Sequence, residues 1–203
     1  FQNINGYVVS SKTIRQWVKE AADYHGIPHL LLAVILQQEN GPNATELQKF
    51  MQFSERIATS MSNVWDEILY DLVPDRLAGG STGIPNMTRT TLRNTVDYTQ
   101  TTYGRHPVPL FERHRVFGDG TLPDLPGFDW KIDLYYAAAH LRQLICMVTD
   151  QICHSDTLNA EQVEKVFALY NGKGDAAMKY GKDAMSRIEK SRSGKQDLVF
   201  YEK

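Results

Sequence analysis

The segment 28–40 (PHLLLAVILQQEN) constrains the fold of this chain more than any other stretch. Apolar residues fill positions 30–36 without interruption, so a helix here would be apolar on every side. A helix of that kind is stable in water only when other elements cover it completely. Gly41 and Pro42 end the segment, because neither residue continues a helix easily. We therefore expect a domain built around one buried central helix.

Apolar residues recur at helical spacing through most of the remaining chain, which predicts an all-α or mainly α fold. Two helix starts carry capping signals: Asp129 before one apolar run, and Asn159 with Gln162 before another. Besides 28–40, the expected helices are 11–24, 43–61, 64–72, 88–103, a helix starting after Asp129, 159–170 and 175–189.

The whole chain, 1–203, is interpreted as a single domain. Residues 104–128 are rich in Pro and Gly and are expected to form a long irregular connection, with a short strand or two. Residues 45–77 look like a helical insertion, and 190–203 like a solvated tail.

Composition excludes several classes of protein. The chain of 203 residues is 42% hydrophobic, with 22 Lys and Arg against 24 Asp and Glu, so nothing suggests a nucleic-acid partner. No apolar run approaches the ~18 residues of a membrane span. His25 and His29 have no carboxylate partner at helical spacing, so neither a metal nor a cofactor is expected. The first residue is Phe1, which suggests a processed form or an excised domain.

Glu39 is the residue with the clearest chemical potential. It follows the apolar run, and the residues one and two turns before it (Leu36, Ile35, Leu32 and Leu31) are all apolar. An apolar environment and the negative end of a helix dipole both disfavour a carboxylate. We therefore expect a raised pKa for Glu39, as a general acid for glycosidic cleavage requires. The alternative is a glutamate at a helix end that turns to water.

Four stretches, in order, resemble the goose-type lysozyme and lytic transglycosylase superfamily. Residues 28–39 resemble its apolar helix ending in the catalytic glutamate, "P-x-L-L-x-A-I-I-x-x-E-S". Residues 81–86 with Thr90 resemble the groove loop "S-x-G-L-M-Q…T". Residues 129–144 resemble the helix "N-x-x-x-G-x-x-Y-L-x-x-L", and residues 168–172 with Tyr180 and Gly181 resemble "A-Y-N-A-G…Y".

The resemblance implies a lysozyme-like fold and a role for each matching residue. Glu39 would be the general acid, and Tyr170 would position the sugar or the acid. Asn171 would hold its turn or contact substrate, and Gly83 would let backbone approach the glycan. Asn86 stands where the family has Gln. The implied substrate is the glycan strand of peptidoglycan, which places the protein outside the cell or in the periplasm, with no cofactor.

The chain departs from the family pattern in two places. Asn40 replaces the usual Ser, and Gly83 lies 44 residues after Glu39, about twice the family's usual gap. The extra residues are the insertion 45–77, which would form a wall of the cleft or dock a partner. Such divergence suggests a specialised branch, for example an antibacterial effector with a cognate immunity or inhibitor protein.

The reaction outcome stays open at this stage. A hydrolase of either stereochemistry needs a second carboxylate, whereas a lytic transglycosylase uses one Glu and the substrate's acetamido group. Glu55 is the candidate if a second carboxylate is needed. Other hypotheses are a chitinase-like enzyme, a catalytically silent glycan-binding module of the same fold, and a helical scaffold unconnected with glycans. A basic cluster in the loop would meet peptide-stem carboxylates or be solvated: Arg105, His106, Arg113, His114 and Arg115.

Overall fold

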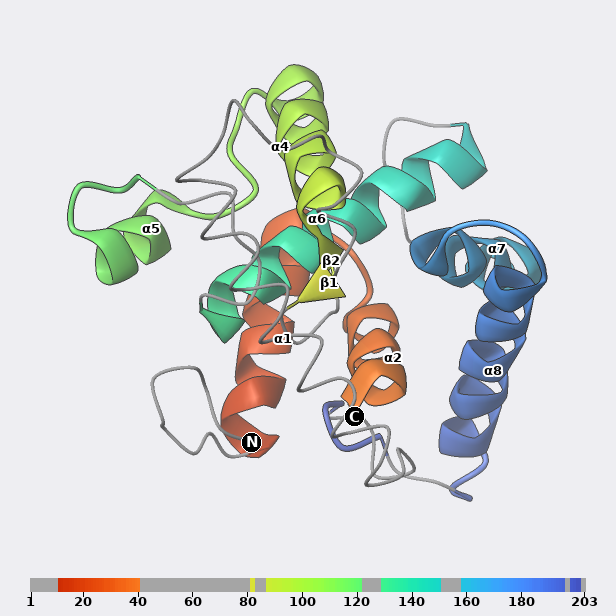
Figure 1. The fold of residues 1–203 in the computed structure, drawn as a ribbon. Helices are drawn as coiled ribbons and strands as arrows, with labels where there is room; N and C mark the ends of the chain where they lie inside the picture. Colours follow the sequence, from red (N-terminus) through yellow and green to blue (C-terminus); the bar gives the residue numbers. More distant parts are fainter. Residues whose placement is uncertain are drawn as a thin grey trace.

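The apolar segment forms α2, His29–Asn40 (Figure 1). All of its apolar residues are buried as predicted except Leu30, which is half-buried. Residues 31–36 are at most 4% exposed in this computed structural model. The structure describes residues 11–40, 81–82, 87–121, 129–150, 158–195 and 198–201, and these are predominantly helical. Helices α1, α6 and α8 pack against α2, which confirms the expected all-α fold around a buried central helix.

Helix α1, Ser11–His25, precedes α2 and buries one apolar stripe: Ile14, Val18, Ala21 and Ala22. Gly26 separates the two helices with φ +62, a left-handed conformation that favours glycine. Its position is also tight, because an added Cβ would lie 2.8 Å from an Arg142 guanidinium nitrogen. The predicted break between the two helices is thus confirmed.

A short antiparallel ribbon leads into α4. Strand β1, Ser81–Thr82, pairs with β2, Met87–Thr88, and Thr88 then caps α4, Arg89–Tyr103, by accepting from the backbone N–H of Thr91. The threonines within α4 are accommodated because Thr95 and Thr99 each donate to the carbonyl four residues earlier, at 2.7 Å.

The expectation of an irregular 104–128 is wrong for its described part, because α5, Leu110–Phe117, lies within it. Pro109 precedes the helix, where a missing N–H costs nothing. The helix is held by Glu112, which is 1% exposed and forms ion pairs with Arg115 and Lys131. A buried carboxylate needs such partners. The spacing of Glu112 and Arg115 is helical, but no periodicity in the sequence indicates Lys131, which lies in another helix.

Two arginines of the predicted basic cluster make contacts within the protein, although both are exposed. Arg105 donates to the backbone oxygen of Tyr24 at 2.8 Å and stacks over its ring. Arg115 pairs with Glu112 and Asp129. These arginines connect elements within the protein, so their charges are engaged there.

Helix α6, Trp130–Thr149, runs through the middle of the molecule and packs against α1, α4 and α7 (Figure 1). Asp129 caps it, as predicted, by accepting from the N–H of Ile132. Its three consecutive alanines, 137–139, are at most 1% exposed, which allows neighbouring helices to approach closely.

Helices α7, Ala160–Asn171, and α8, Asp175–Arg192, form a hairpin on one side of the molecule (Figure 1). The predicted capping box of Asn159 and Gln162 is present with both of its hydrogen bonds. Gly181 lies where α8 presses on α7: an added Cβ would lie 2.6 Å from the backbone oxygen of Glu164.

The solvated tail predicted at 190–203 is wrong in its described part. Residues 190–192 complete α8, and Leu198 and Phe200 are buried at 5% and 1% exposure. The backbone N–H of Val199 donates to Gln37 Oε1 at 3.0 Å, which ties this segment to α2. A run of only four hydrophobic residues, 198–201, in a charged stretch was too short a pattern to predict this docking.

No helix among the described residues combines the length and the apolar character of a membrane crossing.

Candidate active site

A pocket of about 400 Å³ opens at the C-terminal end of α2. It is lined by side chains from five elements and the turn after α7, which are far apart in sequence. The lining residues are Glu39 from α2, Met87 and Thr88 from β2, Thr91 from α4, His140 from α6, Leu169, Tyr170 and Asn171 from α7, and Gly172. Three predicted site residues, Glu39, Tyr170 and Asn171, thus meet in one cavity.

Glu39 is half-buried and reaches this pocket from the last turn of α2. The Tyr180 hydroxyl donates to its Oε1 at 2.8 Å. The adjacent Gln38 donates from Nε2 to the backbone oxygen of Tyr180 at 3.2 Å. Helix α8 therefore holds the end of α2 through two consecutive side chains, and the Glu39 carboxyl has a defined orientation.

Both tyrosines near Glu39 stay protonated at neutral pH. Burial raises the pKa of Tyr170 well above its ordinary value, and the negative charges of Glu39 and Asp133 raise it further. Burial, and then the charges of Glu39 and Tyr170, raise the pKa of Tyr180 in the same way. A neutral phenol beside an acid is a hydrogen-bond donor that adds no charge to the site.

His140 is the second ring in the pocket, 5.4 Å from the Tyr170 ring centroid. Burial lowers its pKa to about 4, so the imidazole is neutral at working pH. Its Nδ1 lies 3.4 Å from both Thr95 Oγ1 and Gln143 Oε1. Since the Thr95 hydroxyl proton goes to Thr91 O and Gln143 Oε1 only accepts, Nδ1 carries the proton. Nε2 is then a hydrogen-bond acceptor.

The turn after α7 completes the rim. Asn171 is the last residue of the helix, and Gly172 follows with φ +115, where its N–H donates to Leu169 O. That backbone conformation requires glycine. Because α8 begins three residues later, the turn brings Tyr170 and Tyr180 toward the same carboxylate.

Three predicted site residues fall outside the described part of the chain: Glu55, Gly83 and Asn86. The insertion 45–77 lies outside it as well. The ribbon on either side of Gly83 and Asn86 is described, and its Met87 and Thr88 line the pocket. The proposed roles of Gly83, Asn86 and Glu55 stay predictions.

Sequence reasoning assigned no role to His140, Asp133 or Tyr180. A signal was nevertheless available: in "N-x-x-x-G-x-x-Y-L", Asp133 takes the place of Asn and His140 that of Tyr. Asp133 is 3% exposed, and its charge acts on Tyr170. These two residues are seven apart, so they lie on the same side of α6. Tyr180 was noted as part of a motif, but its contact with Glu39 depends on the α7–α8 hairpin.

Comparisons with protein-family models, curated proteins and solved structures find no match to this chain.

The chemistry of the pocket follows from its lining. Among the described residues that line it, Glu39 is the one carboxyl group, and it is surrounded by neutral hydrogen-bonding side chains. Within the described residues, no group of three His, Cys, Asp or Glu side chains is arranged to hold a metal ion. A single acid in a polar cavity with an aromatic ring can protonate a leaving oxygen on a neutral polar substrate.

Proposed function

We propose that this chain is a lysozyme-like glycosidase that cleaves the β-1,4 bond between N-acetylmuramic acid and N-acetylglucosamine in peptidoglycan. The proposal is supported chiefly by one observation: Glu39, from the most apolar helix, lines one pocket with Tyr170 and accepts a hydrogen bond from the Tyr180 hydroxyl. The four stretches that resemble the goose-type lysozyme and lytic transglycosylase superfamily provide its second support.

Glu39 acts as the general acid in this reaction. Its proton goes to the glycosidic oxygen as the bond to the anomeric carbon breaks, so the leaving sugar departs as an alcohol. The Tyr180 hydroxyl keeps the carboxyl pointed in one direction. A fixed orientation favours catalysis because no freedom has to be lost when the substrate arrives.

The neutral groups of the pocket suit an uncharged acetamido sugar. The acceptor Nε2 of His140 and the amide of Asn171 can bond the N–H and C=O of an acetamido group. The ring of Tyr170 offers an apolar surface to a sugar face. Asn171 is exposed, which places it where a glycan strand would enter.

Two product outcomes remain for the same acid. In a lytic transglycosylase the acetamido group of the substrate assists and a 1,6-anhydro ring closes, so one carboxyl group suffices. Glu39 is the one carboxyl group among the described lining residues, and the candidate Glu55 lies outside the described residues, so the products have to decide between the outcomes. Hydrolysis requires a second carboxylate, for which Glu55 is the candidate.

The deciding experiment is mass spectrometry of purified peptidoglycan digested by the wild-type chain, Glu39→Gln and Glu189→Gln. Glu189 is an exposed glutamate of α8 and serves as the matched control. We expect anhydro or reducing muropeptides from the wild type and the control, and a loss of at least about 10³-fold in Glu39→Gln. Equal activity in Glu39→Gln would refute the proposal.

The same assay separates the competing functions. A chitinase-like enzyme would release oligosaccharides from chitin and leave peptidoglycan intact. A silent glycan-binding module would bind strands, release no fragments, and retain its binding in Glu39→Gln.

The proposal carries expectations about location and partners. An enzyme with this substrate works in the periplasm or outside the cell, and it needs no cofactor. A cognate immunity or inhibitor protein would have to block the pocket around Glu39 and Asn171, since those groups perform the reaction.

A further inference from the structure

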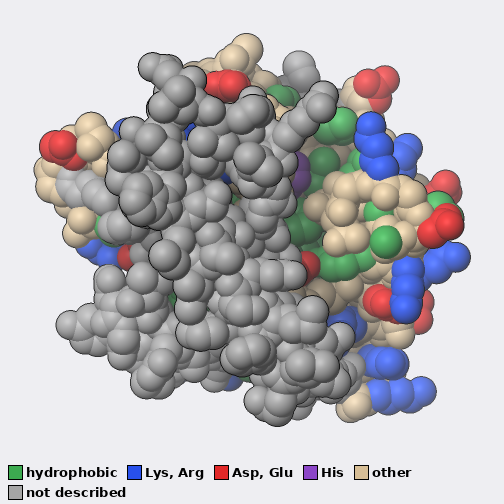
Figure 2. Space-filling model, viewed as in Figure 1, with side chains coloured by type: hydrophobic (Ala, Val, Ile, Leu, Met, Phe, Trp, Pro, Cys, Tyr) green, Lys and Arg blue, Asp and Glu red, His purple; other side chains and the backbone are tan. Residues whose placement is uncertain are grey.

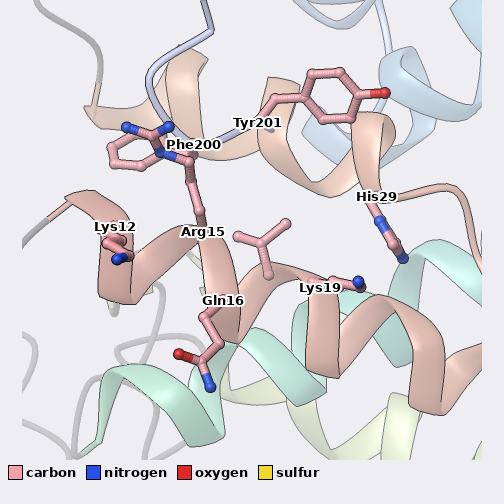
Figure 3. A pocket seen from close by; sticks show the side chains of 8 residues that line it. Lys12, Arg15, Gln16, Lys19, His29, Phe200 and Tyr201 are labelled. Atoms are coloured by element: carbon pink, nitrogen blue, oxygen red, sulfur yellow. The ribbon is translucent and has the colours of Figure 1, made fainter. Parts of the chain in front are cut away.

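A second pocket, of about 220 Å³, lies on the face of α1 that meets the start of α2 (Figure 3). His29 lines it from the first residue of α2, while Glu39 lines the candidate active site from the eleventh. Ten residues of helix correspond to about 15 Å. The two pockets therefore occupy opposite ends of α2 and are separate sites.

One wall of this second pocket is cationic. Lys12, Arg15 and Lys19 lie three and four residues apart on α1, so they share a face of the helix (Figure 3). Like charges at that spacing repel one another.

No carboxylate of the described residues neutralises these three cations. The two acidic residues of α1 are engaged elsewhere: Glu20 pairs with Lys131 at 2.7 Å, and Asp23 with His29. The Arg15 Nε is buried and has no hydrogen-bond acceptor in the described part of the protein. The Nε atoms of Arg89, Arg113 and Arg187 share this condition, but Arg15 is the one of these arginines that lines the second pocket.

The other wall of the pocket is aromatic. Phe200 and Tyr201 come from the C-terminal segment that Gln37 anchors to α2 (Figure 3). Phe200 is 1% exposed and Tyr201 is half-buried, so both rings are held in place by packing. Among the described residues, the pocket thus joins three cations that pair with no carboxylate to the half-buried ring of Tyr201.

We propose that this second pocket binds a phosphate monoester carried on a flat apolar group. A phosphoryl group brings nearly two negative charges and three acceptor oxygens, which fits several cations at once. A carboxylate would neutralise only one of them. Arginine also bonds phosphate oxygens in pairs. The flat group would lie against the half-buried ring of Tyr201.

Calorimetric titration of the full chain with phenyl phosphate, inorganic phosphate and benzoate tests this proposal at low salt. We expect phenyl phosphate to bind most tightly, because it alone supplies both the dianion and the ring. Arg15→Gln and Lys19→Gln should each weaken the affinity for phenyl phosphate about three- to fivefold. Lys19 is exposed, so its variant remains informative if Arg15→Gln fails to fold.

Lys182→Gln is the matched control, because Lys182 is an exposed lysine of α8. Lys and Arg side chains are interspersed with Asp and Glu on the α7–α8 side of the molecule (Figure 2). The control should bind phenyl phosphate like the wild type. If Lys182→Gln lost as much affinity for phenyl phosphate as the Arg15 and Lys19 variants, binding would reflect general charge attraction, and the proposal would be overturned. Benzoate or inorganic phosphate binding as tightly as phenyl phosphate would overturn the ligand class, and no binding at about 10 mM would overturn the site.

Discussion

At the scale of the residue, the environment of Glu39 decides what its carboxyl group can do. A glutamate at a helix end is ordinarily solvated. Here the preceding turns are buried, and Tyr180 donates to the carboxyl group from another helix. The aliphatic surroundings disfavour the charged form of Glu39, whereas the hydrogen bond favours it. The balance between these effects can be measured through Tyr180.

Tyr180→Phe should move the alkaline limb of the pH–rate profile to higher pH. The Tyr180 hydroxyl stabilises the ionised Glu39, so its removal should raise the pKa of that group. A general acid loses activity as pH rises through its pKa, and the active range therefore extends upward. The maximal rate should fall about tenfold, because the carboxyl group loses its orientation.

The measurement is kcat/KM between pH 4 and 9 on soluble glycan fragments, with Tyr98→Phe on α4 as the control. An alkaline limb that stays at the wild-type pH would show that Tyr180 does not influence the catalytic acid.

At the scale of the element, the α7–α8 hairpin determines which side chains reach the pocket. Gly172 turns the chain after Asn171, and Gly181 lets the returning helix approach α7. Tyr180 is adjacent to that point of closest approach. The geometry of the candidate active site therefore depends on a backbone contact as well as on the side chains that line the cavity.

Gly181→Ala should destabilise the protein although alanine is the better helix former. The new Cβ would meet the Glu164 carbonyl at 2.6 Å, and forced overpacking costs about 1–3 kcal/mol. The gain in helix propensity is only about 1 kcal/mol. Urea unfolding should show a net loss of about 1–2 kcal/mol, with a fall in activity as Tyr180 shifts.

Lys182→Ala, one residue further along α8, is the control for that comparison and should change stability by less than about 0.5 kcal/mol. Unchanged or increased stability in Gly181→Ala would mean that the two helices can separate at little cost.

At the scale of the whole molecule, buried groups that join distant segments determine how the fold responds to pH and to truncation. The His25 ring is 2% exposed and bonds the Pro107 carbonyl at 2.8 Å, linking α1 to the segment before α5. Phe200 joins the C-terminal segment to the core. Both contacts cross long stretches of sequence.

Stability should fall as pH decreases from about 6.5 to 4. Burial lowers the pKa of His25 to about 4, and the charges of Arg105 and Arg142 act in the same direction. In that window the unfolded chain binds a proton that the folded chain does not, so acid favours unfolding. The expected loss is about 1.4 kcal/mol per pH unit from this residue. His140, whose pKa is also lowered to about 4, adds to it.

Urea unfolding at pH 7, 6 and 5 measures this slope, the change in the free energy of unfolding per pH unit. His25→Gln, which can still donate to Pro107 O, should flatten it, and His114→Gln on the exposed face of α5 should not. An identical slope in His25→Gln would exclude His25 as its source.

Phe200→Ala should lower the free energy of unfolding by about 3–5 kcal/mol, as expected when a large ring is removed from a core. Thermal unfolding measures the loss, and Lys195→Ala in the exposed turn before this segment should be neutral. A small effect of Phe200→Ala would mean that the C-terminal segment is not part of the cooperative fold.

The sequence alone determined the helices whose signals are local. The apolar run of α2, the caps at Asp129 and Asn159, and the break at Gly26 are all found in the structure, because hydrophobic periodicity and capping act within a few residues. Helix α5 and the docked C-terminal segment were missed, since both are stabilised by partners distant in sequence.

The same division holds for the candidate active site. Glu39 and Tyr170 could be chosen from motifs, but that they share a pocket depends on the packing of α2, α7 and α8. Only the tertiary structure added the Tyr180 hydrogen bond and the neutral His140, and only it joined the cations of α1 to Phe200 in the second pocket. Desolvation and contacts between helices arise when the chain folds, so no local pattern encodes them.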